Sequence, residues 1–264
     1  MTLDSDPTGS RFLIVTADDF GASDWIDRGI FQALETGQIS TVSALTNYPR
    51  AADAIGRLRQ DYPDVGIGIH LNITSGPALI STNNLGILGD EDGNFLGLRS
   101  LLVQIDRLDM VTVTQELHSQ IEVVLNQGIE PDHLSSHHNI LAYNPALQNV
   151  MISLAKEFNL PVRTPVAVSQ THGRRFGYAR TRRRAIRSVV RLLVQRPLLA
   201  FWVLPGYYLR LRQSKHFLDV NNVRHPDHMI DALYGMPTVR NLEHILEHLP
   251  IGISELVMHL ADDV

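Results

Sequence analysis

Short apolar segments alternate with segments of helical periodicity along most of this chain. The segments that predict strands are 12–16, 41–45, 65–71, 133–137, 160–163 and 254–259. The segments whose apolar spacing predicts helices are 26–34, 51–59, 111–126, 145–158, 226–234 and 239–248. Repeated strand–helix units predict an α/β fold with a parallel sheet or barrel. The length of 264 residues and the lack of an internal repeat predict one domain over residues 1–264.

Composition limits the chemistry that the chain can carry. It contains no cysteine, which excludes disulfides and thiolate metal sites and leaves His, Asp and Glu as metal ligands. The first ten residues are polar and acidic, and no run of 18 apolar residues occurs. We therefore expect neither a secretory signal nor a membrane-spanning helix, and we expect a cytoplasmic location.

Charge is distributed unevenly, although the net charge is only −5. Twelve Lys and Arg residues and no Asp or Glu lie within 171–216, together with many aliphatic residues. This pattern predicts a basic, mostly helical insertion at about 171–216. Either the insertion packs on the acidic body of the protein, or 174–212 contacts an anionic membrane, which would place the protein peripherally at the inner membrane surface. Nucleic acid is not an expected partner, because aromatic residues that could stack on bases are not interleaved with the arginines.

Polar side chains follow several predicted strands at the point where each strand ends. They are Asp18 and Asp19 after the first strand, and His70, His137 and His259 at the ends of three later strands. Two adjacent ionised carboxylates repel each other unless a cation or a proton-transfer role stabilises the pair. The simpler alternative is that Asp19 caps the helix that begins near residue 24.

The carboxyl ends of parallel strands meet on one face of a barrel, so these side chains are expected to lie together. One carboxylate and two imidazoles suit a divalent metal with positions left open for water and substrate. A second carboxylate there could take a proton from the attacking water, and a further histidine could protonate the leaving group. Each histidine alone could be structural, and we expect this of His133. Their joint placement predicts a metal site.

Three motifs carry a resemblance to a known family. They are Ala-Asp-Asp-Phe-Gly at 17–21, Gly-Ile-His-Leu-Asn-Ile-Thr at 68–74 and His-Leu-Ser-Ser-His-His at 133–138, with weaker matches at 43–47, 226–228 and 255–259. In this order they resemble the YdjC-like carbohydrate deacetylases, the group that includes the ChbG chitooligosaccharide deacetylase. The basic segment is similar to an Arg-rich, apolar stretch in the HpnK-like branch, which is linked to hopanoid lipid synthesis.

The resemblance implies a distorted (β/α) TIM-like barrel and the metal-dependent removal of N-acetyl groups from an amino sugar, an oligosaccharide or a lipid-linked sugar. By position, the expected metal ligands are Asp19, His70 and His137, the general base is Asp18, the acid is His259, and the substrate contacts are Asn72, Arg163 and Asp227. The resemblance implies magnesium as the metal, whereas the softness of two imidazoles and one carboxylate favours zinc. The expected partners are an N-acetylated sugar and a second copy of the chain in a homodimer.

Two departures from the family pattern keep other functions open. Ser135 stands where the family usually has Asp, and Asn139 stands where it commonly has His. These departures favour a non-catalytic sugar- or lipid-binding relative of the deacetylases. A metal-dependent phosphoesterase is the other alternative, since clusters of His and Asp in barrels also serve phosphate chemistry. Arg163 is the only basic residue in the strand-end motifs, which argues against a phosphate site.

Overall fold

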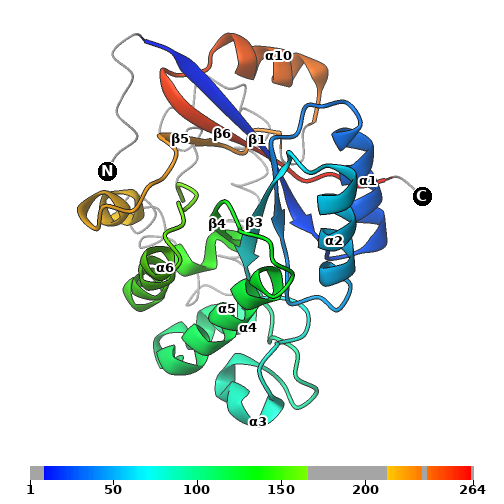
Figure 1. The fold of residues 1–264 in the computed structure, drawn as a ribbon. Helices are drawn as coiled ribbons and strands as arrows, with labels where there is room; N and C mark the ends of the chain where they lie inside the picture. Colours follow the sequence, from blue (N-terminus) through cyan, green and yellow to red (C-terminus); the bar gives the residue numbers. More distant parts are fainter. Residues whose placement is uncertain (1–8, 166–212, 234–236, 263–264) are drawn as a thin grey trace, which may run out of the picture.

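The computed structural model describes residues 9–165, 213–233 and 237–262, which form an α/β fold around one curled sheet (Figure 1). The strands are β1 (Arg11–Phe20), β2 (Thr41–Ala44), β3 (Gly66–Leu71), β4 (Leu134–Ser136), β5 (His228–Ile230) and β6 (Gly252–Met258). The longer helices are α1 (Asp24–Leu34), α2 (Ala51–Asp61), α5 (Met110–Leu125), α6 (Pro145–Glu157) and α10 (Val239–Glu247). The short helices are α3 (Thr82–Leu85), η1 (Gly86–Leu88), α4 (Leu98–Gln104), η2 (Ile105–Arg107) and η3 (His137–Ala142).

All six strands run parallel, in the order β4-β3-β2-β1-β6-β5. Figure 1 shows them curling round to form half of a barrel. The segment that follows α6 adds a single parallel bridge beside β4, between Leu134 and Val162. This architecture confirms the predicted parallel α/β fold and agrees with a distorted barrel.

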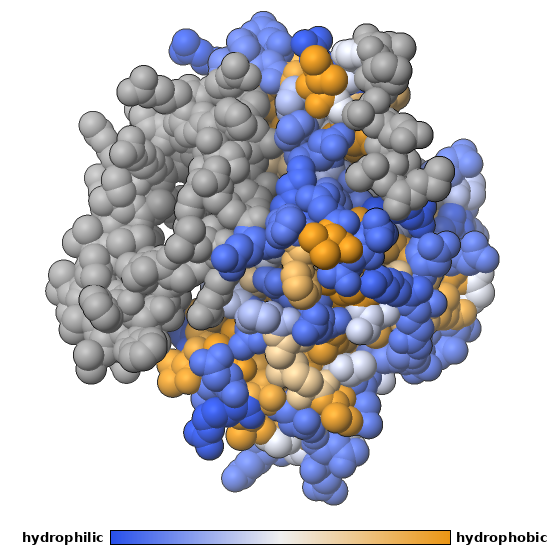
Figure 2. Space-filling model, turned by 90° about the vertical axis from the view of Figure 1, so that its left-hand side faces the viewer, coloured by the Kyte–Doolittle hydropathy of each residue, from blue (hydrophilic) through white to orange (hydrophobic). Residues whose placement is uncertain are grey.

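The helices pack against the sheet because each has one apolar side. For example, α5 buries Val113, Leu117 and Ile121, which recur every three or four residues. Polar side chains cap the first turns of four helices, namely Ser23 for α1, Asp109 for α5, Asn144 for α6 and Thr238 for α10. On the side shown in Figure 2, the described surface is mostly hydrophilic, with apolar residues in small separate patches.

Side chains two residues apart along a strand point to the same side of the sheet. The strand pairing keeps these sides in register, because Thr16 pairs with Thr41 and His70 pairs with Ser135. Polar residues therefore line the inside of the curl in two levels. At the carboxyl ends lie Asp18, His70 with its register partner Ser135, His137 and His259, and the next polar residues towards the amino ends are Thr16, Ser43 and Glu255.

One predicted helix is wrong. The sequence predicts a helix over 226–234, but His228–Ile230 forms β5, an edge strand paired with β6. Met229 and Ile230 are buried there, and three residues are too few for a period of two to outweigh helical spacing in the sequence. The predicted strand over 160–163 is reduced to the bridge at Val162.

The basic segment at 171–216 lies almost wholly outside the described residues, and so does the expected membrane contact at 174–212. The described chain resumes at residue 213, where 213–220 form a helix. Within the ranges that the structure describes, no helix is long and apolar enough to cross a lipid bilayer.

Candidate metal centre and active site

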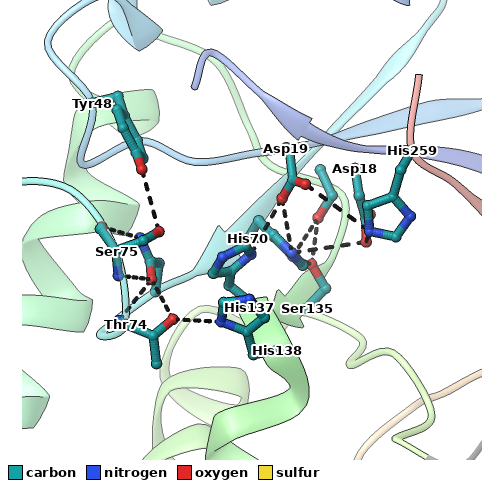
Figure 3. Close-up of polar contacts among 12 residues, drawn as sticks. Asp18, Asp19, Tyr48, His70, Thr74, Ser75, Ser135, His137, His138 and His259 are labelled. Carbon is teal, nitrogen blue, oxygen red and sulfur yellow. Dashed lines mark hydrogen bonds and ion pairs between the residues drawn. The ribbon is translucent and has the colours of Figure 1, made fainter. Parts of the chain in front are cut away.

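An irregularity at the end of β1 brings two consecutive aspartates to the same place. The strand runs to Phe20, so Asp18 and Asp19 lie within it, and its register with β2 shifts between Ala17 and Phe20. Asp19 has a φ of +66°, in the left-handed region that few residues other than glycine occupy. A regular strand would send the two carboxylates to opposite sides, whereas here both join one cluster (Figure 3). Such backbone strain is typical of functional positions.

Gly21 turns the chain sharply from β1 towards α1. Its φ is +85°, and a Cβ atom at this position would lie 2.9 Å from the Cα of Ala51. The Gly21 amide donates a hydrogen bond to Asp27 at 2.7 Å, and Ser23 is the N-cap of α1. The alternative that Asp19 caps this helix is therefore wrong, and Asp19 is available for another role.

Asp19, His70 and His137 converge from β1, β3 and the start of η3 (Figure 3). Asp19 Oδ1 lies 3.2 Å from His137 Nδ1 and 3.6 Å from His70 Nε2. The candidate ligand atoms all lie within 4.8 Å of one another. Asp19 Oδ1 is buried and has no well-formed hydrogen bond to any described residue. The three side chains thus form a possible metal-binding triad, and the orphaned oxygen fits a bound cation.

Two serines hold the His70 ring in the orientation that a metal ligand needs. His70 Nδ1 lies 2.6 Å from Ser135 Oγ, which in turn donates to the Ile69 carbonyl at 3.4 Å and contacts Ser43 Oγ. If Ser135 donates to the carbonyl, it accepts from His70 Nδ1–H, and the lone pair of Nε2 then faces Asp19. The serine that replaces the usual aspartate therefore still positions His70, but without a negative charge.

The environment of the triad favours the protonation states that bind a metal. Burial lowers the pKa of His70 well below its usual value, which keeps the ring neutral. Burial raises the pKa of Asp19, but its close contact with His137 and its electrostatic interaction with His70 outweigh this effect, so the net pKa is lowered. A neutral imidazole and an ionised carboxylate are the forms that ligate a metal.

Asp18 belongs to a buried ionic network rather than to the triad. Arg163 donates two hydrogen bonds to Asp18, both of 2.7 Å, and its Nε donates to Glu255 at 2.9 Å. Thr16 donates to the same Glu255 oxygen at 2.8 Å. Burial lowers the pKa of Arg163, but Asp18 and Glu255 more than compensate, so its pKa is raised. Arg163, which is expected to contact the substrate, donates three hydrogen bonds to two carboxylates in the structure.

The charges of the cluster also fit a divalent cation. Among the described groups, Asp18 and Glu255 contact the guanidinium of Arg163, and Asp19 adds a third carboxylate to the cluster. Three carboxylates and one guanidinium leave two negative charges among these four groups in a largely buried site. Uncompensated buried charge is costly, and an ion of charge +2 would neutralise it.

His259 lies at the rim of the same cluster, directly after β6 (Figure 3). Its Nε2 is 4.0 Å from Asp18 Oδ2 and 4.0 Å from Asp19 Oδ2. Its side chain is 37% exposed, compared with 3% for Asp18. The structure therefore brings together the five residues that sequence analysis places in the metal and catalytic roles.

Two of the expected substrate contacts, Asn72 and Asp227, hold backbone amides in the structure. Asn72 is buried, and its side-chain oxygen accepts from the amides of Thr74 and Ser75, so it shapes the loop after β3. Asp227 precedes β5, and its Oδ2 accepts from the amide of Ile253 near the start of β6. Asp227 is thus at the amino end of the sheet, opposite the triad.

The sequence alone assigns no role to His138 or Glu255. His138 follows His137, but β4 has already ended, so the two neighbours need not point to opposite sides. Its φ is +55°, its ring centroid is 3.9 Å from that of His137, and its Nδ1 is 3.0 Å from Thr74 Oγ1 (Figure 3). Burial and the neighbouring His137 lower the pKa of His138 to about 4. The His-His pair at 137–138 and the glutamate in the motif at 255–259 are the sequence signals that could have identified these two residues.

Comparison with known proteins identifies the family of this chain. The family model described as "YdjC-like protein" matches residues 12–263. This chain belongs to the YdjC-like family. The match includes Asp18, Asp19, His70, His137 and His259, all of which lie in the cluster.

Two curated relatives of this YdjC-like protein carry the name carbohydrate deacetylase. One, from Geobacillus stearothermophilus, is 35% identical over 61% of this chain and 62% of its own length. Another, from Halalkalibacterium halodurans, is 36% identical over 58% of this chain and 63% of its own length. The aligned part thus spans somewhat less than two thirds of each relative.

A solved structure from Enterococcus faecalis V583, named for cellobiose-phosphate cleavage, has a similar fold. Its TM-score is 0.72, with 23% sequence identity, and the match covers 97% of this chain and 83% of the other. At this identity the similarity supports the fold alone, and it supports it over nearly the whole YdjC-like chain.

Proposed function

We propose that this protein is a metal-dependent hydrolase that removes N-acetyl groups from an amino sugar, free or linked to an oligosaccharide or lipid. One observation carries the proposal: the buried, unpaired Oδ1 of Asp19 faces two imidazoles, next to a second carboxylate fixed by an arginine. The names of the carbohydrate deacetylase relatives support the substrate class.

Asp19, His70 and His137 would hold the metal. When bound, a divalent metal would polarise the acetamide carbonyl and lower the pKa of water at the site. Two nitrogen donors and one oxygen donor favour zinc or a similar transition metal, whereas the family resemblance points to magnesium. The activity assay proposed below therefore compares the two ions directly.

Asp18 is suited to accept the proton of the attacking water. The two hydrogen bonds from Arg163 fix the plane of its carboxylate. Each carboxylate oxygen keeps a further lone pair for a proton or a water molecule. Asp18 Oδ2 also lies 3.8 Å from His70 Nε2, which puts the base beside the triad.

His259 is suited to protonate the departing amine. Its position at the rim places it where a substrate entering from solvent would meet the cluster, and its Nε2 faces both aspartates. The imidazole nitrogen of a histidine can act as a general acid toward a departing amine.

The other two functions receive less support from the site. A phosphate group needs cations or amide donors, but Arg163 is engaged by Asp18 and Glu255. A purely binding protein has no need of a second carboxylate and a third histidine beside a complete ligand triad. Both arguments favour the amide hydrolase.

The decisive experiment measures acetate release from a panel of N-acetylglucosamine conjugates by the metal-stripped protein, reconstituted with Zn²⁺ or Mg²⁺. We expect release with one of these ions and none with the stripped protein or with His70→Ala. Hydrolysis of phosphate esters without acetate release would replace this proposal by the phosphoesterase. Sugar binding without either reaction would replace it by the non-catalytic relative.

A further inference from the structure

A second group of metal-ligating side chains lies at the end of α10, apart from the site described above. His244, Glu247 and His248 each offer one donor atom, and these atoms lie within 4.8 Å of one another. His244 and Glu247 are in the last turn of the helix, and His248 is its C-cap. Since β6 begins soon afterwards, at Gly252, this group lies towards the amino ends of the strands, whereas Asp19 lies at the carboxyl ends.

The helix holds the three side chains on one face. Glu247 and His248 lie three and four positions after His244, and residues at these spacings are neighbours on the surface of a helix. The rings of His244 and His248 have centroids 4.3 Å apart and an interplanar angle of 42°. Ile245 is 1% exposed and packs with Leu256 of β6, so the core fixes the helix that carries the donors.

A hydrogen bond already sets the tautomer of His248. Its Nδ1 lies 2.9 Å from the carbonyl oxygen of His244. A carbonyl can only accept, so Nδ1 carries the hydrogen and Nε2 carries the lone pair. Histidines that bind metals typically donate their other ring N–H to a carbonyl or carboxylate in this way.

The position in the helix and the types of donor also favour a cation. The carbonyl groups at a helix C-terminus carry partial negative charge, which attracts cations. Glu247 adds an exposed carboxylate to the two imidazoles. Nitrogen donors select zinc and its neighbours among the transition metals rather than magnesium.

We propose that His244, Glu247 and His248 form a second site for a zinc-class divalent cation. The ion would join the last turn of α10 to its C-cap, with its remaining positions open to water. The chain would then hold two metal sites of different surroundings, one inside the curl of the sheet and one on its surface. This inference does not depend on the deacetylase proposal.

Zinc stoichiometry of the full chain provides the test. Metal-stripped protein is dialysed against buffered low-micromolar Zn²⁺, and bound zinc is counted by elemental analysis. We expect His244→Ala/His248→Ala to hold one zinc fewer per chain than the unaltered protein, and His70→Ala/His137→Ala to keep the zinc on α10. His248→Ala alone should weaken that zinc by at least about tenfold, since even lost outer contacts of metal ligands typically cost 10–100-fold.

His118→Ala is the matched control. His118 lies 3.5 Å from Glu122 and 3.1 Å from Glu157, so it is a helical histidine between two carboxylates without a second imidazole. We expect it to keep the full zinc content. Equal zinc in the unaltered protein and the double variant would overturn the proposal, and so would an equal loss in His118→Ala. His248→Gln, with circular dichroism to confirm folding, gives the same readout if the double variant does not fold.

Discussion

Both ends of the curled sheet carry an aspartate in contact with histidine. The two aspartates differ in how many of their carboxylate oxygens have a hydrogen-bond partner. At the amino end, Asp132 Oδ1 lies 2.6 Å from His133 Nδ1, and its Oδ2 accepts from Thr41 at 2.9 Å. At the carboxyl end, Asp19 Oδ1 meets two imidazoles but has no well-formed hydrogen bond to a described residue. Both carboxylate oxygens of Asp132 therefore have a partner, whereas Oδ1 of Asp19 has no hydrogen-bond partner among the described residues.

The surroundings of the two pairs differ in the same way. The side chains of Asp132 and His133 pack directly against Gly66 and Gly68, where a Cβ atom would overlap them. A cavity of about 150 Å³ borders His133, with room for water to meet its buried Nε2. At the carboxyl end, strain, excess negative charge and several imidazoles coincide. This contrast teaches that shared residue types do not identify a site, whereas the coincidence of strain, excess charge and converging imidazoles does.

Loss of a triad ligand should have the largest effect on metal binding and turnover. The same kind of change at the amino end should affect neither. His70→Ala, His137→Ala or Asp19→Asn should lower metal affinity by at least about 10–100-fold and abolish turnover. His133→Ala, at the amino end, is the control and should keep the metal. Elemental analysis after dialysis is the measurement, and full occupancy in the three triad variants would end the assignment.

Asp18→Asn should have the next largest effect, because it removes the proposed base without removing a ligand. Turnover should fall by roughly 10²–10⁴-fold, the usual contribution of a general base, with metal content unchanged. Steady-state kinetics combined with metal analysis tests this. If Asp18→Asn released the metal while Asp19→Asn retained it, the two roles would have to be exchanged.

Glu255→Gln should have a smaller effect that acts through Arg163. The amide can still accept from Arg163 and Thr16 but no longer balances the guanidinium charge, so Asp18 should be held less accurately. We expect turnover to fall by roughly tenfold to hundredfold, with KM and metal content little changed, because small misplacements of catalytic groups are costly. Rescue by Glu255→Asp would support a positioning role, and an unchanged turnover would contradict it.

Changes at the amino end should alter stability and leave turnover nearly unchanged. A Cβ at Gly68 would overlap the His133 ring, so Gly68→Ala should destabilise the fold by about 1–3 kcal/mol. Asp132→Asn should cost about 1 kcal/mol, since its side chain is 43% exposed and the lost interactions are partly screened. Urea unfolding measures both, and a tenfold fall in turnover would break the distinction between the two ends.

The pH dependence of stability should follow from the same aspartate. Burial raises the pKa of Asp132, but its contacts with His133 and Thr41 outweigh this effect and lower the net pKa. Its contribution is therefore fully present above the unfolded pKa of about 3.9 and is lost as the pH falls through the lower folded value. Comparing the unfolding midpoint of the unaltered protein with that of Asp132→Asn at neutral and acidic pH tests the sign. The difference should shrink in acid.

Sequence patterns were sufficient for the parallel fold and for the residues of the cluster, because strand ends in such folds share one face. They could not show that β1 continues through Asp18 and Asp19 with a change of register, since a bulge has no periodicity of its own. They also placed Arg163 with the substrate. Its partnership with Asp18 and Glu255 joins three distant parts of the chain, and only the folded chain shows it.

The edge of the sheet beside β4 has a consequence for how such a protein can diversify. The amide of Val162 donates to the carbonyl of Arg224 at 2.8 Å, so the chain that leaves the sheet after α6 is already tied to the chain that returns before β5. With both ends fixed, each doubling of an intervening loop costs only about 0.6 kcal/mol in closure entropy. The length of chain inserted between Arg163 and Arg224 can therefore vary at low entropic cost, while the ligand triad stays unaltered.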